Sequence, residues 1–240
     1  MVMAIITIVT ITTIMDSTSL YRLMAWLSPS YPVGAFSYSH GIEWLVESGA
    51  IRDRDSLALW LADLLRFSSG RNDAILFAQA YRAAERQDFD TLCKIADMAS
   101  ALSGTAERGL ETNAQGDAFA DVTRRTWAST TLDKLTAQYE FPVSYPVAVG
   151  IAAADHAVEL HSALRAYVHA FTANLVSAGV RLIPLGHSDG QRVMQALEPA
   201  VEDAARAGES GDLSSLSSIT IMADIASMKH ETQYTRLFRS

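Results

Sequence analysis

The sequence predicts an all-α fold, a single compact bundle of about eight to ten helices with a flexible C-terminal tail. From residue 16 onward, apolar residues recur three and four positions apart, which is the period of an amphipathic helix. No segment shows the strict alternation of a half-buried strand. Because we find no internal repeat and no strong domain boundary, residues 16–240 are expected to form one domain.

The first half of the chain contains several helical patterns separated by breaking residues. Asp16 or Ser17 is expected to cap a first helix that ends near Pro29. A second helix around residues 42–46 should stop at Gly49, and Asp53 or Asp55 should start a third. The expected core stripes of the following helices are Leu57, Leu61, Leu64 and Leu65, then Ala74, Phe77, Ala78 and Tyr81, then Leu92, Ile95, Ala96, Ala99 and Leu102.

The second half is dominated by a long apolar stripe over residues 160–178, which predicts a central buried helix. The stretch from Arg181 to Gly190 is interpreted as a turn in which Ser188 or Asp189 caps the next helix. Residues 208–218 are rich in Gly and Ser and are expected to form a flexible joint. Residues 219–240 would then be a tail that docks on a partner.

The first fifteen residues need a separate interpretation because they are uncharged and rich in β-branched side chains. The run is too short to span a bilayer as a helix and lacks the basic start of a secretory signal. We expect residues 1–15 to be an unstructured extension, consistent with a start-site artefact, with Met15 as an alternative start. A chain that begins at Met15 should therefore be as stable as the full chain.

Composition argues against several classes of partner. The formal net charge of −8 removes the usual electrostatic basis for binding nucleic acid or an anionic membrane. A single cysteine cannot form an internal disulfide or a thiolate metal cage, which suits a reducing compartment. The expected location is cytoplasmic.

No residue pattern predicts a catalytic, cofactor-binding or metal-binding site. The Gly-rich residues 185–191 lack the Gly-Lys-Ser/Thr ending of a phosphate loop. The six histidines form no helical ligand pair, and His40 with Glu43 would supply only two ligands. Ser37 or Ser39 beside His40 lacks the strand, elbow and helix that expose a nucleophilic serine. A metal carrier and a helical enzyme of unknown reaction remain the alternatives to a non-catalytic protein that holds other proteins together.

Two segments favour protein binding. The loop at 29–41 is aromatic and stiffened by proline, so its rings are either core plugs or anchors for a partner. The segment 228–240 ends with two apolar residues between two arginines, which a frayed terminus does not need. The candidate partner-binding residues are Tyr31, Phe36, Tyr38, His40, Glu43, Lys229, His230, Glu231, Tyr234, Arg236, Leu237, Phe238 and Arg239.

An ordered set of segments resembles the UreF family of urease accessory proteins, from about residue 20 to the end of the chain. The segments are Pro29 to Glu43, Glu111-Thr112 with Gln115-Gly116, Phe141 to Asp155, Ala173 to Gln191, and Asp224 to Ser240. Two positions depart from the family pattern: Ile42 stands in place of leucine, and His187 in place of glutamine. The second departure leaves the role of that turn open.

The resemblance implies a chaperone or adaptor and not an enzyme. It implies an all-helical homodimer that binds the accessory protein UreD, also called UreH, and recruits the GTPase UreG. That assembly would dock on apo-urease and support GTP-dependent nickel insertion. GTP and its magnesium ion would belong to the partner, so no cofactor is expected on this chain.

Overall fold

The computed structural model describes residues 16–217 and 220–240, and these residues form helices and loops without any strand. This confirms the predicted all-α class. The predicted extension at 1–15 lies outside the described residues. The helices are α1 (Ser17–Trp26), η1 (Ala35–Ser37), α2 (Ile42–Glu47), α3 (Arg54–Phe67), α4 (Ser69–Glu85), α5 (Phe89–Ala101), α6 (Ala106–Thr126), α7 (Thr130–Gln138), α8 (Tyr145–Asp155), α9 (Leu160–Leu182), α10 (His187–Ser210), η2 (Leu213–Ser215) and α11 (Ile221–Glu231).

Side-chain caps begin several of these helices, and the cap of α3 is the predicted Asp53, whereas Asp16 precedes α1 without a side-chain capping bond. Asp53 accepts a hydrogen bond from the backbone N–H of Ser56 at 2.8 Å, and the Ser56 hydroxyl closes the reciprocal bond at the start of α3. Glu159 caps α9 by accepting from the backbone N–H groups of His161 and Ser162. These bonds satisfy N–H groups that would otherwise lack an intrahelical partner.

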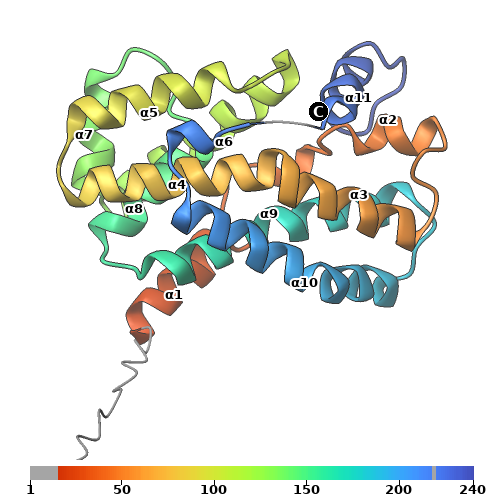
Figure 1. The fold of residues 1–240 in the computed structure, drawn as a ribbon, viewed down its shortest axis with the longest axis horizontal. Coiled ribbons are helices and arrows are strands. Elements are labelled where there is room, and N and C mark those ends of the chain that lie inside the picture. Colours follow the sequence, from red (N-terminus) through yellow and green to blue (C-terminus); the bar gives the residue numbers. More distant parts are fainter. Residues whose placement is uncertain (1–15, 218–219) are drawn as a thin grey trace, which may run out of the picture.

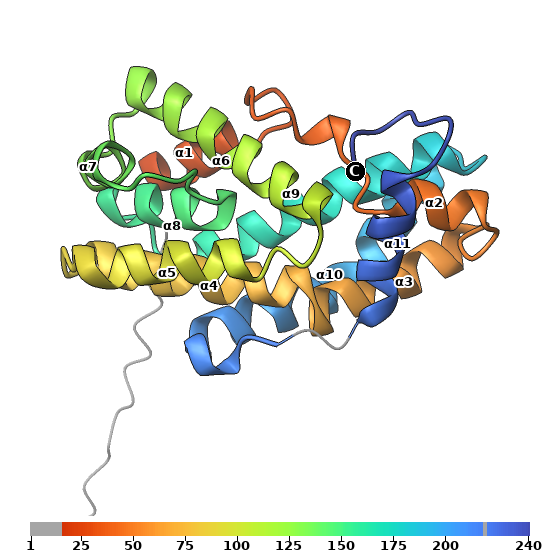
Figure 2. The ribbon, with the colours of Figure 1, turned by 90° about the horizontal axis from the view of Figure 1, so that it is seen from above.

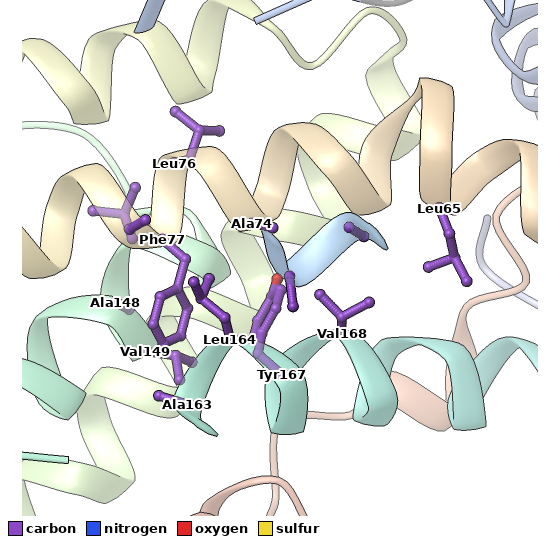
Figure 3. Close-up of a cluster of buried hydrophobic side chains, with 14 of the residues drawn as sticks. Leu65, Ala74, Leu76, Phe77, Ala148, Val149, Ala163, Leu164, Tyr167 and Val168 are labelled. Carbon is purple, nitrogen blue, oxygen red and sulfur yellow. The ribbon is translucent and has the colours of Figure 1, made fainter. Parts of the chain in front are cut away.

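Helix α4 forms the centre of the bundle and packs against α3, α5, α8, α9 and α10 (Figures 1 and 2). Figure 3 shows the ring of Phe77 on α4 among Val149 of α8 and Leu164 of α9. The backbones of α4 and α8 approach closely at Gly150, where a Cβ atom would lie 2.5 Å from the carbonyl oxygen of Phe77. Helix α8 is apolar on every face, and its residues 146–153 are buried.

The turn between α9 and α10 differs from its prediction. Helix α10 begins at His187 with Gly186 as its N-cap, so Ser188 and Asp189 lie inside the first turn and do not cap it. Asp189 instead accepts a hydrogen bond from Arg192 Nη1 at 2.8 Å. His187 is exposed.

The joint predicted at 208–218 starts too early, because α10 continues through Ser210. Gly208 is buried, and a Cβ atom there would lie 2.7 Å from the carbonyl oxygen of Ala74. Glycine at this position therefore lets α10 pack tightly on α4 and does not mark a break. Asp212 then caps η2 through the backbone N–H groups of Ser214 and Ser215. Residues 218–219 lie outside the described residues.

The C-terminal segment forms a helix followed by an irregular stretch with bends at residues 234–235 and 237–238. Helix α11 packs against α2 and α6 at one end of the bundle, and residues 232–240 turn back toward the loop that precedes α2 (Figures 1 and 2). Tyr234 and Leu237 are exposed, whereas Phe238 and Ser240 are buried. Within the described chain, none of the helices is both long enough and apolar enough to cross a membrane.

Candidate partner-binding site

Glu43 on α2 is the residue that fixes the end of the chain. Its carboxylate is buried and accepts hydrogen bonds from the backbone N–H of Leu237 at 2.6 Å and of Phe238 at 2.9 Å. Gly41 precedes α2 with a φ of +78°, and a Cβ atom there would lie 3.0 Å from the backbone of α11. Glycine therefore allows the close packing that brings Glu43 to the tail.

His230 on α11 lies between two carboxylates and is completely buried. Its Nε2 is 3.1 Å from Oε2 of Glu43, and its Nδ1 is 2.8 Å from Oε2 of Glu107 on α6. Arg236 donates to the other oxygen of Glu107 at 2.8 Å. Burial raises the pKa of Glu107, although His230 and Arg236 oppose that rise. The tail is thus held by alternating acidic and basic groups.

The last two residues make a second set of contacts, with the loop at 29–41 and with Glu111 of α6. The backbone N–H of Arg239 donates to the carbonyl oxygen of Ser37 at 2.8 Å. The carbonyl oxygen of Ser240 accepts from the backbone N–H of Ser39 at 2.6 Å and from its hydroxyl at 2.5 Å. The Ser240 hydroxyl donates to Oε2 of Glu111 at 3.0 Å. Ser39 is therefore bound to the tail and not to His40.

The loop aromatics divide between the core and the surface. Tyr31 and Tyr38 are buried, and the Tyr31 hydroxyl lies 2.9 Å from Oγ1 of Thr123 on α6. Phe36 is exposed, and its carbonyl oxygen accepts from Arg181 on α9 at 2.9 Å. Tyr31 and Tyr38 are therefore packed in the interior, and Phe36 is the candidate ring of this loop that is exposed to solvent.

A cavity of about 280 Å³ lies behind the loop and is lined by tyrosine and phenylalanine rings from α8, α9 and the loop itself. Its polar end contains His40, Asp73, Arg108 and Glu111. Burial and the nearby Arg108 lower the pKa of His40. Burial raises the pKa of Asp73 to about 6.

Glu111 connects this cavity to the tail. Its Oε2 lies 3.1 Å from Nδ1 of His40 and also accepts from Ser240. Burial alone would raise the pKa of Glu111, but His40, Arg108 and Ser240 together lower it below its ordinary value. The carboxylate thus holds His40 and Ser240 in place through hydrogen bonds to the same oxygen.

Ser69, His40 and Glu111 are arranged in the order of a serine, histidine and acid relay. Ser69 Oγ lies 3.0 Å from Nε2 of His40. The guanidinium of Arg108 contacts the same ring nitrogen. Ser69, His40, Glu111 and Arg108 therefore form one connected polar network beside the cavity.

Sequence reasoning did not select Asp73, Glu107 or Arg108 as site residues, and Glu111 entered only through the family resemblance. Glu107 and Glu111 lie four residues apart on α6 and both face inward. A spacing of four residues places two side chains on the same face of a helix and could have indicated a shared site. Charged pairs at this spacing nevertheless lie mostly on solvent-exposed faces, so the spacing alone did not predict burial. Across the described residues, no group of three or more His, Cys, Asp or Glu side chains is placed to hold a metal ion.

The exposed part of the C-terminal segment combines apolar and basic side chains. Leu237 is 66% exposed and borders a hollow that Leu110 of α6, Arg236 and Arg239 also line. Tyr234 is fully exposed nearby in the chain. We call these five residues the tail surface. Lys229 and Glu231 are exposed at the end of α11, whereas His230 points inward.

Comparison with known proteins identifies the chain. The UreF family model matches residues 51–198. The urease accessory protein UreF of Rhodopseudomonas palustris (strain TIE-1) is 50% identical over 225 residues, which cover 94% of each chain. The UreF protein of Bradyrhizobium diazoefficiens is 51% identical over 225 residues, covering 94% of this chain and 93% of the relative. The chain belongs to the UreF family of urease accessory proteins.

Proposed function

We propose that this protein is a non-catalytic adaptor that binds UreD (UreH) and the GTPase UreG and supports GTP-dependent nickel insertion into apo-urease. Family membership supports a role in urease maturation. In this proposal the protein acts in the cytoplasm as a homodimer. GTP and magnesium ion belong to the GTPase in this proposal, and the adaptor itself holds neither.

The single observation that carries the adaptor proposal is the tail surface. Leu110, Tyr234 and Leu237 are large apolar side chains that solvent reaches, and Arg236 and Arg239 flank them. Aromatic and arginine side chains are enriched at protein interfaces, and an exposed leucine beside them adds apolar area that a partner can bury. We assign UreD to this surface.

The docked tail determines which candidate residues can contact UreD. Tyr234, Leu237 and Arg239 point outward, so they are the proposed contact residues. Glu43, His230 and Phe238 are buried beneath them and act by holding the tail in position. Phe36, the exposed ring of the neighbouring loop, is the proposed contact outside the tail.

A pull-down with purified UreD tests this proposal. The variant Tyr234→Ala/Leu237→Ala removes exposed side chains without removing a buried group. Burying a leucine or tyrosine at an interface contributes roughly 1.5 to 3 kcal/mol, so the double variant should bind UreD at least about tenfold more weakly. Leu59→Ala on α3 is the matched control, because Leu59 is 67% exposed, the same degree as Leu237.

Unchanged UreD binding by the double variant would contradict the assignment of the tail surface. Equal losses in the double variant and in Leu59→Ala would instead indicate a general loss of structure, which thermal melting would detect. In a reconstituted mixture, the double variant should activate urease less than the unmodified chain and less than Leu59→Ala, as it does for UreD binding. Sedimentation of the purified chain tests the proposed homodimer.

A further inference from the structure

The cavity behind the loop at 29–41 has the size and the opening of a small-molecule site. Its volume is about 280 Å³. An apolar cavity of about 150 Å³ is enough to hold benzene, so this one has room for a ring and a further group of similar size. Phe36, His169 and Ser177 line the cavity and are exposed, which shows that it opens to solvent. A cavity of this kind with a few convergent polar groups is the usual form of a small-molecule site.

Most of the cavity wall is aromatic. The rings of Tyr31, Tyr145, Tyr167 and Phe171 all line it. The ring centroids of Tyr145 and Tyr167 are 5.5 Å apart, and Phe171 packs edge-on against the imidazole of His40 at 5.2 Å. Because the rings hold one another, the wall is a preformed apolar surface. Such a surface favours a ligand with a ring or another large apolar group.

Asp73 of α4 supplies a negative group that lacks a strong partner. In the part of the chain that the structure describes, its carboxylate accepts one hydrogen bond, from the hydroxyl of Tyr167 at 3.3 Å. Hydrogen bonds between a hydroxyl and an oxygen are usually shorter, at about 2.5–3.0 Å. Burial raises the pKa of Asp73 to about 6, so the group is ionised above that pH. A carboxylate with this much unused capacity can bind a cationic donor from a ligand.

Arg108 of α6 supplies a positive group in the same cavity. Its Nε makes no hydrogen bond, and its guanidinium contacts the imidazole of His40. Glu111, which follows on the same helix, pairs with His40 instead. No ion pair joins Arg108 to a carboxylate anywhere among the described residues. Arg108 opposes the rise in the pKa of Asp73, so the two opposite charges lie near each other without pairing.

The hydroxyl of Tyr145 is a third polar group without a partner. Thr112 accepts a hydrogen bond from the backbone N–H of Tyr145 and leaves its hydroxyl free. Burial raises the pKa of this hydroxyl, so it stays protonated and is available as a donor. The cavity therefore offers an anion, a cation and a neutral donor beside an aromatic wall.

We propose that this cavity binds a free α-amino acid with a large apolar side chain, whose ammonium group pairs with Asp73, whose carboxylate pairs with Arg108, and whose side chain lies among the aromatic rings. An α-amino acid carries both charges within one small molecule, so it satisfies both protein groups at once. A simple amine would leave Arg108 unpaired, and a simple carboxylate would leave Asp73 unpaired, which is unfavourable away from water. The inference goes beyond the proposed adaptor function and does not depend on UreD.

Calorimetric titration of the purified full-length chain tests this proposal with a matched set of probes. L-phenylalanine carries all three groups, phenethylamine lacks the carboxylate, phenylpropanoate lacks the ammonium group, and L-alanine lacks the ring. We expect L-phenylalanine to bind saturably. Each of the other three probes should bind at least about tenfold more weakly, because each loses one charged or one apolar contact.

Two substitutions should weaken the probes in opposite patterns. Asp73→Asn should weaken L-phenylalanine and phenethylamine at least about tenfold and leave phenylpropanoate unchanged. Arg108→Gln should weaken L-phenylalanine and phenylpropanoate and leave phenethylamine unchanged. The matched controls Asp121→Asn and Arg125→Gln remove the charges of an exposed pair on α6 and should alter no affinity. Thermal melting checks that each variant is folded, and Asp73→Asn decides the proposal alone if Arg108→Gln is not.

Three outcomes would overturn the proposal. Neither L-phenylalanine nor L-leucine could show saturable binding at millimolar concentration. The four probes could bind with equal affinity, which would exclude recognition of the charged groups. Asp73→Asn could leave the affinity for L-phenylalanine unchanged, which would place the binding elsewhere. All of these measurements use the purified chain without UreD, so their failure is distinguishable from failure of the proposed adaptor function.

Discussion

Glu43 and His230 lie 187 residues apart in the sequence, yet Oε2 of Glu43 is 3.1 Å from Nε2 of His230 in the folded chain. Glu43 lies in the first turn of α2, and His230 lies in the last turn of α11. Glu107 approaches the other ring nitrogen. Because both ring nitrogens face carboxylate oxygens, this contact joins three helices and secures the C-terminal segment to the core.

Replacing His230 by alanine should destabilise the protein and release the tail. The substitution leaves two buried carboxylates without their shared partner, and breaking a buried pair by removing one member costs about 3–5 kcal/mol. Urea unfolding would measure the change. His161→Ala is the control, since His161 pairs with Glu209 at the surface, where such pairs contribute about 1 kcal/mol or less. An equal loss in the free energy of unfolding for His230→Ala and His161→Ala would show that His230 contributes no more to stability than a surface histidine.

Replacing Asp73 by asparagine should stabilise the protein at neutral pH. Burial raises the pKa of Asp73 from 3.8 to about 6, so ionisation of this group opposes folding. The protonated form of Asp73 is favourable for folding. Its contribution to stability is complete below pH 3.8, where the group is protonated in both the folded and the unfolded state, and it is lost as pH rises through about 6. Above pH 6 the variant should therefore gain about 1–3 kcal/mol, and asparagine can still accept the hydrogen bond from Tyr167.

Thermal melts of the Asp73→Asn variant between pH 4 and pH 8 would check this prediction. The gain should grow from pH 4 to about pH 6 and then remain constant. Asp121→Asn serves as the control, because Asp121 pairs with Arg125 on the exposed side of α6 and no such pH-dependent gain is expected there. A pH-independent effect of Asp73→Asn would contradict burial as the cause.

Local patterns predicted most of the helices but neither the start nor the end of α10. The stripe at residues 160–178 predicted α9 because a buried helix face has a clear period. Gly186 was not predicted as the cap of α10, since Ser188 and Asp189 are stronger capping types. Gly208 was interpreted as a break because its packing against Ala74 depends on a contact far away in the sequence.

The candidate site was predicted only in part for a similar reason. The sequence selected Glu43, His230 and the tail, but it did not indicate that they contact one another. Glu107 has a charged side chain on a helix, and such residues are exposed far more often than buried. Its burial follows from His230 and Arg236, which reach it from more than 120 residues away. Only the tertiary structure supplies those partners.

Replacing Gly116 by alanine should disrupt the packing of α6 on the segment that enters α8. A Cβ atom at Gly116 would lie 1.9 Å from the carbonyl oxygen of Val143, and backbone atoms cannot move aside easily. We expect a loss of about 3 kcal/mol or more. Gly109→Ala on the same helix is the control, because its nearest neighbour is Ser103 Cβ at 3.5 Å. That variant should gain up to about 1 kcal/mol of stability, measured by urea unfolding. Similar unfolding midpoints for the two variants would contradict the close approach.

Two deletions of different length should separate the fold-supporting part of the C-terminal segment from its surface. Deleting residues 232–240 removes Arg236, two backbone donors to Glu43 and the Ser240 contacts, but it keeps His230 between its carboxylates. Deleting residues 229–240 also removes His230, which leaves the carboxylates of Glu43 and Glu107 without the hydrogen-bond partner that they share. The longer deletion should therefore melt at a temperature at least about 5 °C below that of the shorter one, given about 2–4 °C per kcal/mol for a chain of this size. Both deletions should lose UreD binding in a pull-down. If the shorter deletion stays folded and still binds UreD, the partner contacts lie outside the tail, and if both deletions melt at the same temperature, His230 does not stabilise the core.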